Sequence, residues 1–336
     1  MNVSSLTSLR LIRTALCRRR PSPGRFAPPL CRSRAGGNPA SLLLGAALSL
    51  AALPSHAALN VLACEPEWAA LAQELGGDRV KTSSATTALQ DPHRVEARPS
   101  LIARARNADL LVCTGLELEV GWLPILLQQS GNAKIAPGQP GYFEAGPLVP
   151  RLEIPVRLDR SEGDVHPGGN PHVQGNPRNV ALVAAALAKR LAEVDPGDAA
   201  FYQARYKDFS ERWTAAIAKW EQQATPLKGV AVVVHHKNMS YLLGWLNMPE
   251  AGALEPKPGI EPSAAHLGGL VAQLQRQPAK MVLRAAYQDG RASEWLAEQA
   301  KIPAVVLPFT VGGNDRAKDL FGLFDDTISR LLGAAK

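Results

Sequence analysis

Strand-like and helix-like patterns alternate along this sequence in two separate blocks. Short apolar runs are interspersed with amphipathic stretches whose apolar residues recur at helical spacing. The apolar runs of the first block cover residues 59–64, 80–85 and 108–113, and those of the second cover 230–234, 280–283 and 304–307. Because strands that alternate with helices pair in parallel, we predict an α/β protein with two lobes, each a mainly parallel sheet flanked by helices.

The stretch between the two blocks combines a proline-rich segment with two helices. Eight prolines between positions 137 and 177 disfavour regular structure, and loops of this length in compact proteins are usually functional or disordered. Helical spacing then covers 178–194 and 199–224. At 1.5 Å per residue the second helix would be about 39 Å long, enough to join two lobes as one long rigid helix. We therefore predict a first lobe over 58–194, a linking helix over 195–227 and a second lobe over 228–336.

The first 57 residues differ in composition from the rest of the chain. They contain eight arginines and no acidic residue. The apolar run 42–53 is too short to cross a bilayer of about 30 Å as a helix, and Ser55-His56-Ala57 has the small-x-small pattern of a cleavage site. We predict a signal segment that is cleaved after Ala57 and directs the protein to the periplasm, rather than a membrane anchor.

Without this segment the charge of the chain is close to zero. The formal charge of the whole sequence is +7 and the leader carries +8, which leaves 7 − 8 = −1 for residues 58–336. A nucleic-acid-binding protein would need lysines and arginines clustered on one face. We therefore predict that nucleic acid is not a partner.

Two cysteines, Cys64 and Cys113, follow the leader, and each ends an apolar run. An oxidising compartment would allow them to pair. Because a disulfide between neighbouring parallel strands is geometrically awkward, we predict buried free thiols instead, and we assign neither cysteine to a metal.

The informative histidines stand in loops that follow strands or precede a helix. His93 follows Pro92 after the second strand, His172 follows Pro171 ahead of the helix 178–194, and His235 and His236 directly follow the strand 230–234. Open α/β sheets place ligand sites in such loops. Successive strand residues face opposite sides, so only one of the last pair can readily bind the same ion. We predict His93, His172 and His236 as metal ligands and keep His235 as a secondary candidate.

A series of short motifs occurs here in the order found in a known family. The motifs are Asp91-Pro92-His93, Arg98-Pro99-Ser100, Asn107-Ala108-Asp109, Gly115 with Glu117 and Glu119, Trp122-Leu123, Asn170-Pro171-His172 with Asn176-Pro177 and Asn179, His236 with Tyr241, and Gly259-Ile260-Glu261-Pro262-Ser263. Over residues 59–336 the chain resembles the metal-binding solute-binding proteins of bacterial ABC importers, of the ZnuA/TroA type.

The resemblance implies a receptor, not an enzyme, that holds a divalent metal ion in the cleft between its lobes and delivers it to the membrane permease of an ABC importer. We expect a monomer. Three neutral nitrogen donors suit Zn²⁺, whereas Mn²⁺ favours carboxylates and water, so zinc is the predicted cargo. A receptor for manganese, iron, another divalent metal or a chelate is the alternative. A zinc hydrolase is less favoured, because the chain has no His-Glu-x-x-His run.

A tetrahedral zinc site needs a fourth ligand besides the three histidines. Many relatives supply a glutamate after the strand 280–283, but this chain has Ala285-Ala286-Tyr287-Gln288 there. Since relatives also place an aspartate in the loop 310–316, the resemblance points to Asp315. Water, Glu65 after the first strand and His166 in the proline-rich segment are the other candidates.

Overall fold

The computed structural model describes residues 57–157, 159, 161 and 163–336. The predicted signal segment, apart from Ala57, lies outside the described residues. Within the described residues, no helix combines the length and apolar character that crossing a membrane would require.

The first sheet contains four parallel strands in the order β2-β1-β3-β4. They are β1 (Leu59–Ala63), β2 (Val80–Ser84), β3 (Leu110–Cys113) and β4 (Tyr142–Glu144). The helices α1 (Pro66–Gly76), α2 (Pro99–Arg106) and α3 (Leu123–Ser130) follow the first three strands. Each has a proline in its first turn, where the missing N–H has no intrahelical partner to lose. The carboxyl ends of the parallel strands meet at one edge of the sheet, and the loops after β1 and β2 begin there.

The second sheet repeats this arrangement, with four parallel strands in the order β6-β5-β7-β8. The strands are β5 (Val232–Val234), β6 (Glu250–Ala253), β7 (Met281–Ala285) and β8 (Ala304–Leu307). The helices between them are α6 (Ser240–Leu246), α7 (Ala264–Leu274) and α8 (Arg291–Ala300). The predicted α/β class with two parallel sheets is therefore confirmed.

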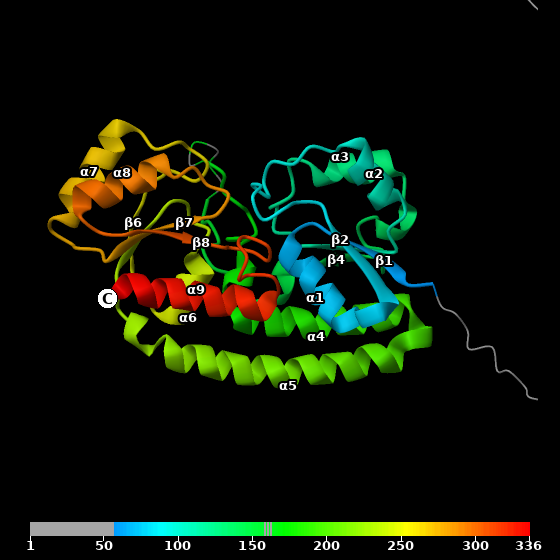
Figure 1. The fold of residues 1–336 in the computed structure, drawn as a ribbon. Helices are drawn as coiled ribbons and strands as arrows, with labels where there is room; N and C mark the ends of the chain where they lie inside the picture. The colour runs from blue at the N-terminus through cyan, green and yellow to red at the C-terminus, as the bar shows by residue number, and fades with distance from the viewer. Residues whose placement is uncertain (1–56, 158, 160, 162) are drawn as a thin grey trace, which may run out of the picture. The chain divides into compact units, whose positions relative to one another are not determined.

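Three further α-helices form a packed group, of which two stand between β4 and β5 in the chain and one follows β8. They are α4 (Pro177–Val194), α5 (Ala199–Gln223) and α9 (Leu320–Ala335), and α5 packs against both of the others. Figure 1 shows α5 running below both sheets. One cluster of buried side chains contains Val61 of the first sheet, Val232 of the second, and Trp213 and Trp220 of α5. The predicted long helix thus shares a core with both lobes, which gives the loops between them a common support.

Cys64 and Cys113 form a disulfide, so the predicted free thiols are wrong. β1 and β3 are neighbouring strands with Ala63 opposite Val112, and this register sets the two cysteines directly opposite each other. Their Cα atoms are 4.7 Å apart, within the range that a disulfide spans. The prediction failed because the pairing register, which brings the two Cα atoms so close, could not be read from the sequence.

Candidate metal centre

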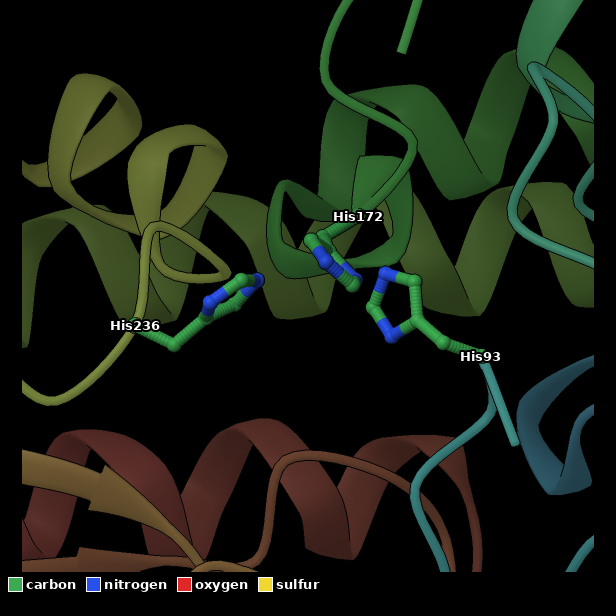
Figure 2. A group of neighbouring side chains, drawn as sticks. All are labelled: His93, His172 and His236. Atoms are coloured by element: carbon green, nitrogen blue, oxygen red, sulfur yellow. The ribbon is translucent and has the colours of Figure 1, made fainter. Parts of the chain in front are cut away.

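Three imidazole rings converge at the ends of the two sheets. The ring centroids of His93 and His172 are 5.3 Å apart, those of His172 and His236 are 5.7 Å apart, and those of His93 and His236 are 5.9 Å apart. One ring nitrogen from each histidine lies within 4.8 Å of the other two. Figure 2 shows the three side chains, which come from separate segments, pointing toward one another. We call these residues the histidine triad.

His93 is held by the loop that follows β2. Asp91 Oδ1 accepts hydrogen bonds from the backbone N–H of His93 at 3.0 Å and pairs with its ring Nδ1 at 2.7 Å. The indole N–H of Trp122 donates to the carbonyl of Pro92 at 2.9 Å and anchors the same loop. Because Asp91 occupies Nδ1, the buried Nε2 of His93 is left without a partner and is available to a metal.

His172 is the most deeply buried member of the triad. Its exposed fraction is 1%, and both of its ring nitrogens are buried without a hydrogen-bond partner. The backbone N–H of His172 donates to Asn170 Oδ1 at 3.0 Å, which forms a local turn around Pro171. Asn170 Nδ2 also donates to the carbonyl of Lys237, next to His236. Burial, together with the positive charge that His93 can carry, lowers the pKa of His172 well below its ordinary value, so its ring is a neutral nitrogen donor.

His236 follows β5 and is oriented by a carboxylate from the end of β6. Its Nδ1 lies 2.6 Å from Glu255 Oε2, which also accepts a hydrogen bond from the backbone N–H of Gly259 at 2.7 Å. A carboxylate on one imidazole nitrogen fixes the tautomer and makes the other nitrogen a better metal ligand. Nε2 of His236 is therefore the atom available to the ion. Glu255 was not identified from the sequence, because it lies nineteen residues after His236 in a stretch without any motif.

The geometry of the triad suits a small tetrahedral ion after a modest contraction. Zinc–nitrogen bonds of about 2.0–2.1 Å in a tetrahedron separate the nitrogens by about 3.4 Å. The ligand nitrogens of the triad all lie within 4.8 Å of one another, so only small side-chain rotations separate this arrangement from a tetrahedral one. Asp91 and Glu255, behind two of the rings, supply negative charge that compensates a divalent ion without coordinating it.

Aromatic side chains close the centre where β7 and β8 end. The ring of Phe309 lies 5.7 Å from that of His172, and the ring of Tyr287 lies 5.6 Å from that of Phe309. The hydroxyl of Tyr287 accepts a hydrogen bond from Asn238 at 3.1 Å. The sequence showed that Tyr287 stands near the position of a missing glutamate, but it gave no sign that Phe309 would face His172.

Asp315 is not brought to the triad. It is exposed in the loop between β8 and α9, and among the described residues the group of ligand atoms around the triad contains the three histidines alone. Phe309, earlier in the same segment, is the residue whose ring lies against His172.

Glu65 is buried, but it belongs to a cluster of acids inside the first lobe. Its Oε2 accepts a hydrogen bond from Thr114 Oγ1 at 3.0 Å, and it is hydrogen-bonded to Glu119. Burial, and then the charges of Glu119 and Glu67, raise the pKa of Glu65 well above its ordinary value. Among the described residues, the group of ligand atoms at the triad does not include Glu65.

The two remaining histidines of interest take different positions. His235 lines a cavity of about 480 Å³ together with Asp289, Arg291 and Trp295, and its side chain is not part of the triad. His166 lies beside the triad, with its ring centroid 5.4 Å from that of His93. Burial, and secondly the charge of His93, lower the pKa of His166 to about 4, so its ring is neutral at physiological pH.

Two parallel sheets joined by a long helix, with three imidazoles converging between them, define a two-lobed metal-binding protein. The chain belongs to the family described as zinc-uptake complex component A, periplasmic, whose model matches residues 61–334. The family predicted from the motifs is therefore confirmed, and the protein is a ZnuA-family metal-binding component of an ABC transporter.

Named relatives bind different metals. The chain is 25% identical over 270 residues to the manganese ABC transporter substrate-binding lipoprotein scaA of Streptococcus gordonii, covering 79% of this chain and 84% of the relative. It is 25% identical over 298 residues to the high-affinity zinc uptake system protein ZnuA of Paracoccus denitrificans, covering 79% and 87%. A crystal structure of ZnuA shares the fold with a TM-score of 0.70 at 22% identity, covering 83% of this chain and 100% of that one.

Proposed function

We propose that this protein captures Zn²⁺ outside the cytoplasm, holds it with His93, His172 and His236, and delivers it to the membrane permease of an ABC importer. The ion is cargo, and the protein is a receptor that catalyses no reaction. We also propose that the protein is exported to the periplasm with cleavage after Ala57, and that it works as a monomer.

The observation that supports this most directly is the state of His172. It is buried in the triad with both ring nitrogens unpartnered. A buried polar atom without a partner costs about 1–3 kcal/mol, and coordination to a metal removes that cost for the nitrogen that binds. A site that carries such a cost without its ligand is typical of a protein built to bind one.

The donor set favours zinc over manganese. The triad offers three imidazole nitrogens, and among the described residues no carboxylate joins the group. Imidazole suits zinc and copper, whereas manganese favours carboxylate and water oxygen. We assign the fourth position of the bound ion to water, because Asp315 is exposed in this structure. Manganese remains the competing cargo, since several relatives are named as manganese-binding proteins.

Metal titrations of the purified protein test the proposal. After removal of bound metal with a chelator, zinc and manganese are titrated in competition with a chromophoric chelator of known affinity. We expect one zinc per chain, with zinc bound much more tightly than manganese. His93→Ala, His172→Ala and His236→Ala should each weaken zinc binding by at least about a hundredfold, whereas His235→Ala, the matched control, should not. Stoichiometric tight zinc in all three triad variants, or tighter binding of manganese than of zinc, would reject the proposal.

A further inference from the structure

His166 lines two cavities that reach the triad. The inner cavity, of about 180 Å³, is lined by His166 together with His172 and His236. The outer cavity, of about 880 Å³, is lined by His166 together with His93. Asp164, Val165 and His166 are the residues that line both cavities. His166 therefore stands where the two cavities border each other.

The described lining of the outer cavity contains more acidic than basic side chains. Its acids are Glu117, Asp159 and Asp164 and its one guanidinium is that of Arg94; Asp159 is paired with Arg157 at 2.8 Å, which leaves two acids against one base. Concave surfaces lined mainly by one sign of charge concentrate ions of the opposite sign and accelerate their association. The outer cavity is thus suited to collecting a divalent cation before it meets the triad.

His166 and His93 form a pair of donors at the boundary. Their ring centroids are 5.4 Å apart, and the rings are tilted by 33°. The ring of His166 is hydrogen-bonded to the backbone of Glu117, which leaves its second nitrogen for a metal. His93 belongs both to this pair and to the triad, while the triad group excludes His166. The two sets of donors therefore share one residue.

We propose that His166 and His93 form an outer, transient metal position through which the ion passes between the acidic cavity and the triad. This inference rests on the proposed function. The ion keeps its bond to His93 while His172 and His236 replace His166, so only coordination bonds change. A divalent ion without donors in a poorly solvated site is strongly unfavourable, and replacing donors one at a time avoids that state.

Passage of the ion through the outer position, which we call the relay, affects the rates of binding differently from a permanent ligand. A group that binds the ion only during passage lowers the barrier equally for entry and release. Removing it therefore slows association and dissociation by the same factor and leaves Kd unchanged. A histidine that stayed bound as a fourth ligand would instead raise Kd when removed, mainly through faster release.

Stopped-flow measurement of zinc association, and of release into excess chelator, tests the relay with His166→Ala. We expect both rates to fall by about tenfold or more, with Kd changed by less than about twofold. His266→Ala is the matched control, because His266 stands on α7 and its Nε2 pairs with the carbonyl of Ala253, away from the triad. Unchanged rates in His166→Ala, or a rise in Kd that comes from release alone, would overturn the inference.

A second measurement isolates the outer position at equilibrium. In a His172→Ala/His236→Ala double variant, His93 and His166 remain, and we expect weak zinc binding that disappears when His166→Ala is added. Circular dichroism checks that each variant is folded. Equal weak binding with and without His166 would reject the outer position.

The result for the wild-type protein separates this inference from the proposed function. If the wild-type protein itself fails to bind zinc, the proposed function fails. If it binds zinc tightly but His166→Ala leaves both rates intact, the relay alone fails.

Discussion

Glu255 Oε2 lies 2.6 Å from Nδ1 of the predicted ligand His236 and 2.7 Å from the backbone N–H of Gly259. One carboxylate oxygen thus orients the ring of His236 and anchors a turn. That turn also contacts the segment carrying His166, because Asp164 N–H donates to the carbonyl of Pro258 at 2.9 Å. The histidine triad and the segment that carries His166 therefore share this support.

Replacing Glu255 should weaken metal binding without removing a ligand. Loss of a carboxylate that orients a metal-bound histidine typically costs about 10–100-fold in affinity. We expect Glu255→Ala to show a loss in this range and Glu255→Gln a smaller one, because the amide oxygen can still accept both hydrogen bonds. Competitive zinc titration measures the effect. The control is Glu294→Gln, an exposed acid on α8. Wild-type affinity in Glu255→Ala would show that this contact does not position His236.

His172 should limit the stability of the metal-free protein while being required for binding. Replacing it with leucine removes two buried unpartnered nitrogens, so we expect His172→Leu to raise the free energy of unfolding in the presence of a chelator by about 1–2 kcal/mol. Added zinc should then give no further stabilisation, because ligand-linked stabilisation requires binding. Denaturant unfolding with and without zinc measures both effects.

His235→Leu provides the comparison for this variant. Nδ1 of His235 is likewise buried and unpartnered, but its side chain lies outside the triad. The His235→Leu variant should therefore still be stabilised by zinc, whereas the His172→Leu variant should not. Zinc-dependent stabilisation that survives in His172→Leu would contradict the assigned role of His172.

Glu67 should make the protein less stable as the pH rises through neutrality. Burial raises its pKa from 4.5 to about 7, although Thr310 Oγ1 donates a hydrogen bond to its Oε2. A carboxyl whose pKa is higher in the folded state contributes its full stability below pH 4.5, and that contribution is lost as the pH rises through about 7. Glu67→Gln resembles the protonated form, so at pH 8 it should exceed the wild type in unfolding free energy by about 2–3 kcal/mol.

Comparing the unfolding free energies at pH 4.5 and pH 8 isolates the contribution that Glu67 makes to the pH dependence of stability. At pH 4.5 the variant and the wild type should be equally stable. The depressed pKa values of His166 and His172 produce the opposite trend below pH 6.5, but they are present in both proteins and cancel in the difference. Glu298→Gln, an exposed acid on α8, should show no such dependence. An equal difference at both pH values would show that Glu67 does not titrate in this range.

The convergence of the loops that carry the histidine triad could be predicted because two of these loops follow strands that the sequence marks clearly. β2 and β5 precede His93 and His236, and the proline before His93 and His172 marks a loop rather than an element interior. The long helix could be predicted equally well from its helical spacing: the predicted range was 199–224, and the helix in the structure is Ala199–Gln223.

The parts that could not be predicted depend on pairing between distant segments. The edge strands β4 and β6 are short and contain few β-branched residues, so no strand was predicted there. Because β6 was missed, Glu255 at its end had no reason to be placed beside His236. Two further features likewise depend on contacts between segments that are distant in the chain: the strand register that joins Cys64 to Cys113 and the approach of Phe309 to His172. No local sequence pattern indicates either of them.

The disulfide should contribute to stability and leave the metal centre intact. It closes a loop with a sequence separation of 49 residues, for which the chain-entropy model gives about 4 kcal/mol. We expect Cys64→Ser/Cys113→Ser to lose about 2–4 kcal/mol of unfolding free energy under oxidising conditions, while Kd for zinc stays within about threefold of the wild type. Under reducing conditions the difference in stability should shrink. A large loss of zinc affinity in a folded double variant would link the cysteines to the centre.

Phe309 should help to set the selectivity against manganese. Its ring lies 5.7 Å from His172, where it presents carbon rather than oxygen to the centre. Its backbone has φ of 67°, a conformation that aspartate and asparagine adopt more readily than bulky residues. Phe309→Asp should therefore be tolerated by the backbone, and it would add the carboxylate oxygen that manganese favours.

We expect Phe309→Asp to raise the affinity for manganese relative to zinc by about tenfold, which corresponds to about 1.4 kcal/mol. Parallel titrations of both metals measure the ratio. Phe309→Leu is the matched control, because it removes the aromatic ring without adding an oxygen donor, and its ratio should stay that of the wild type. If Phe309→Leu shifted the ratio as much as Phe309→Asp, packing around His172, and not the type of donor, would determine which metal the protein prefers.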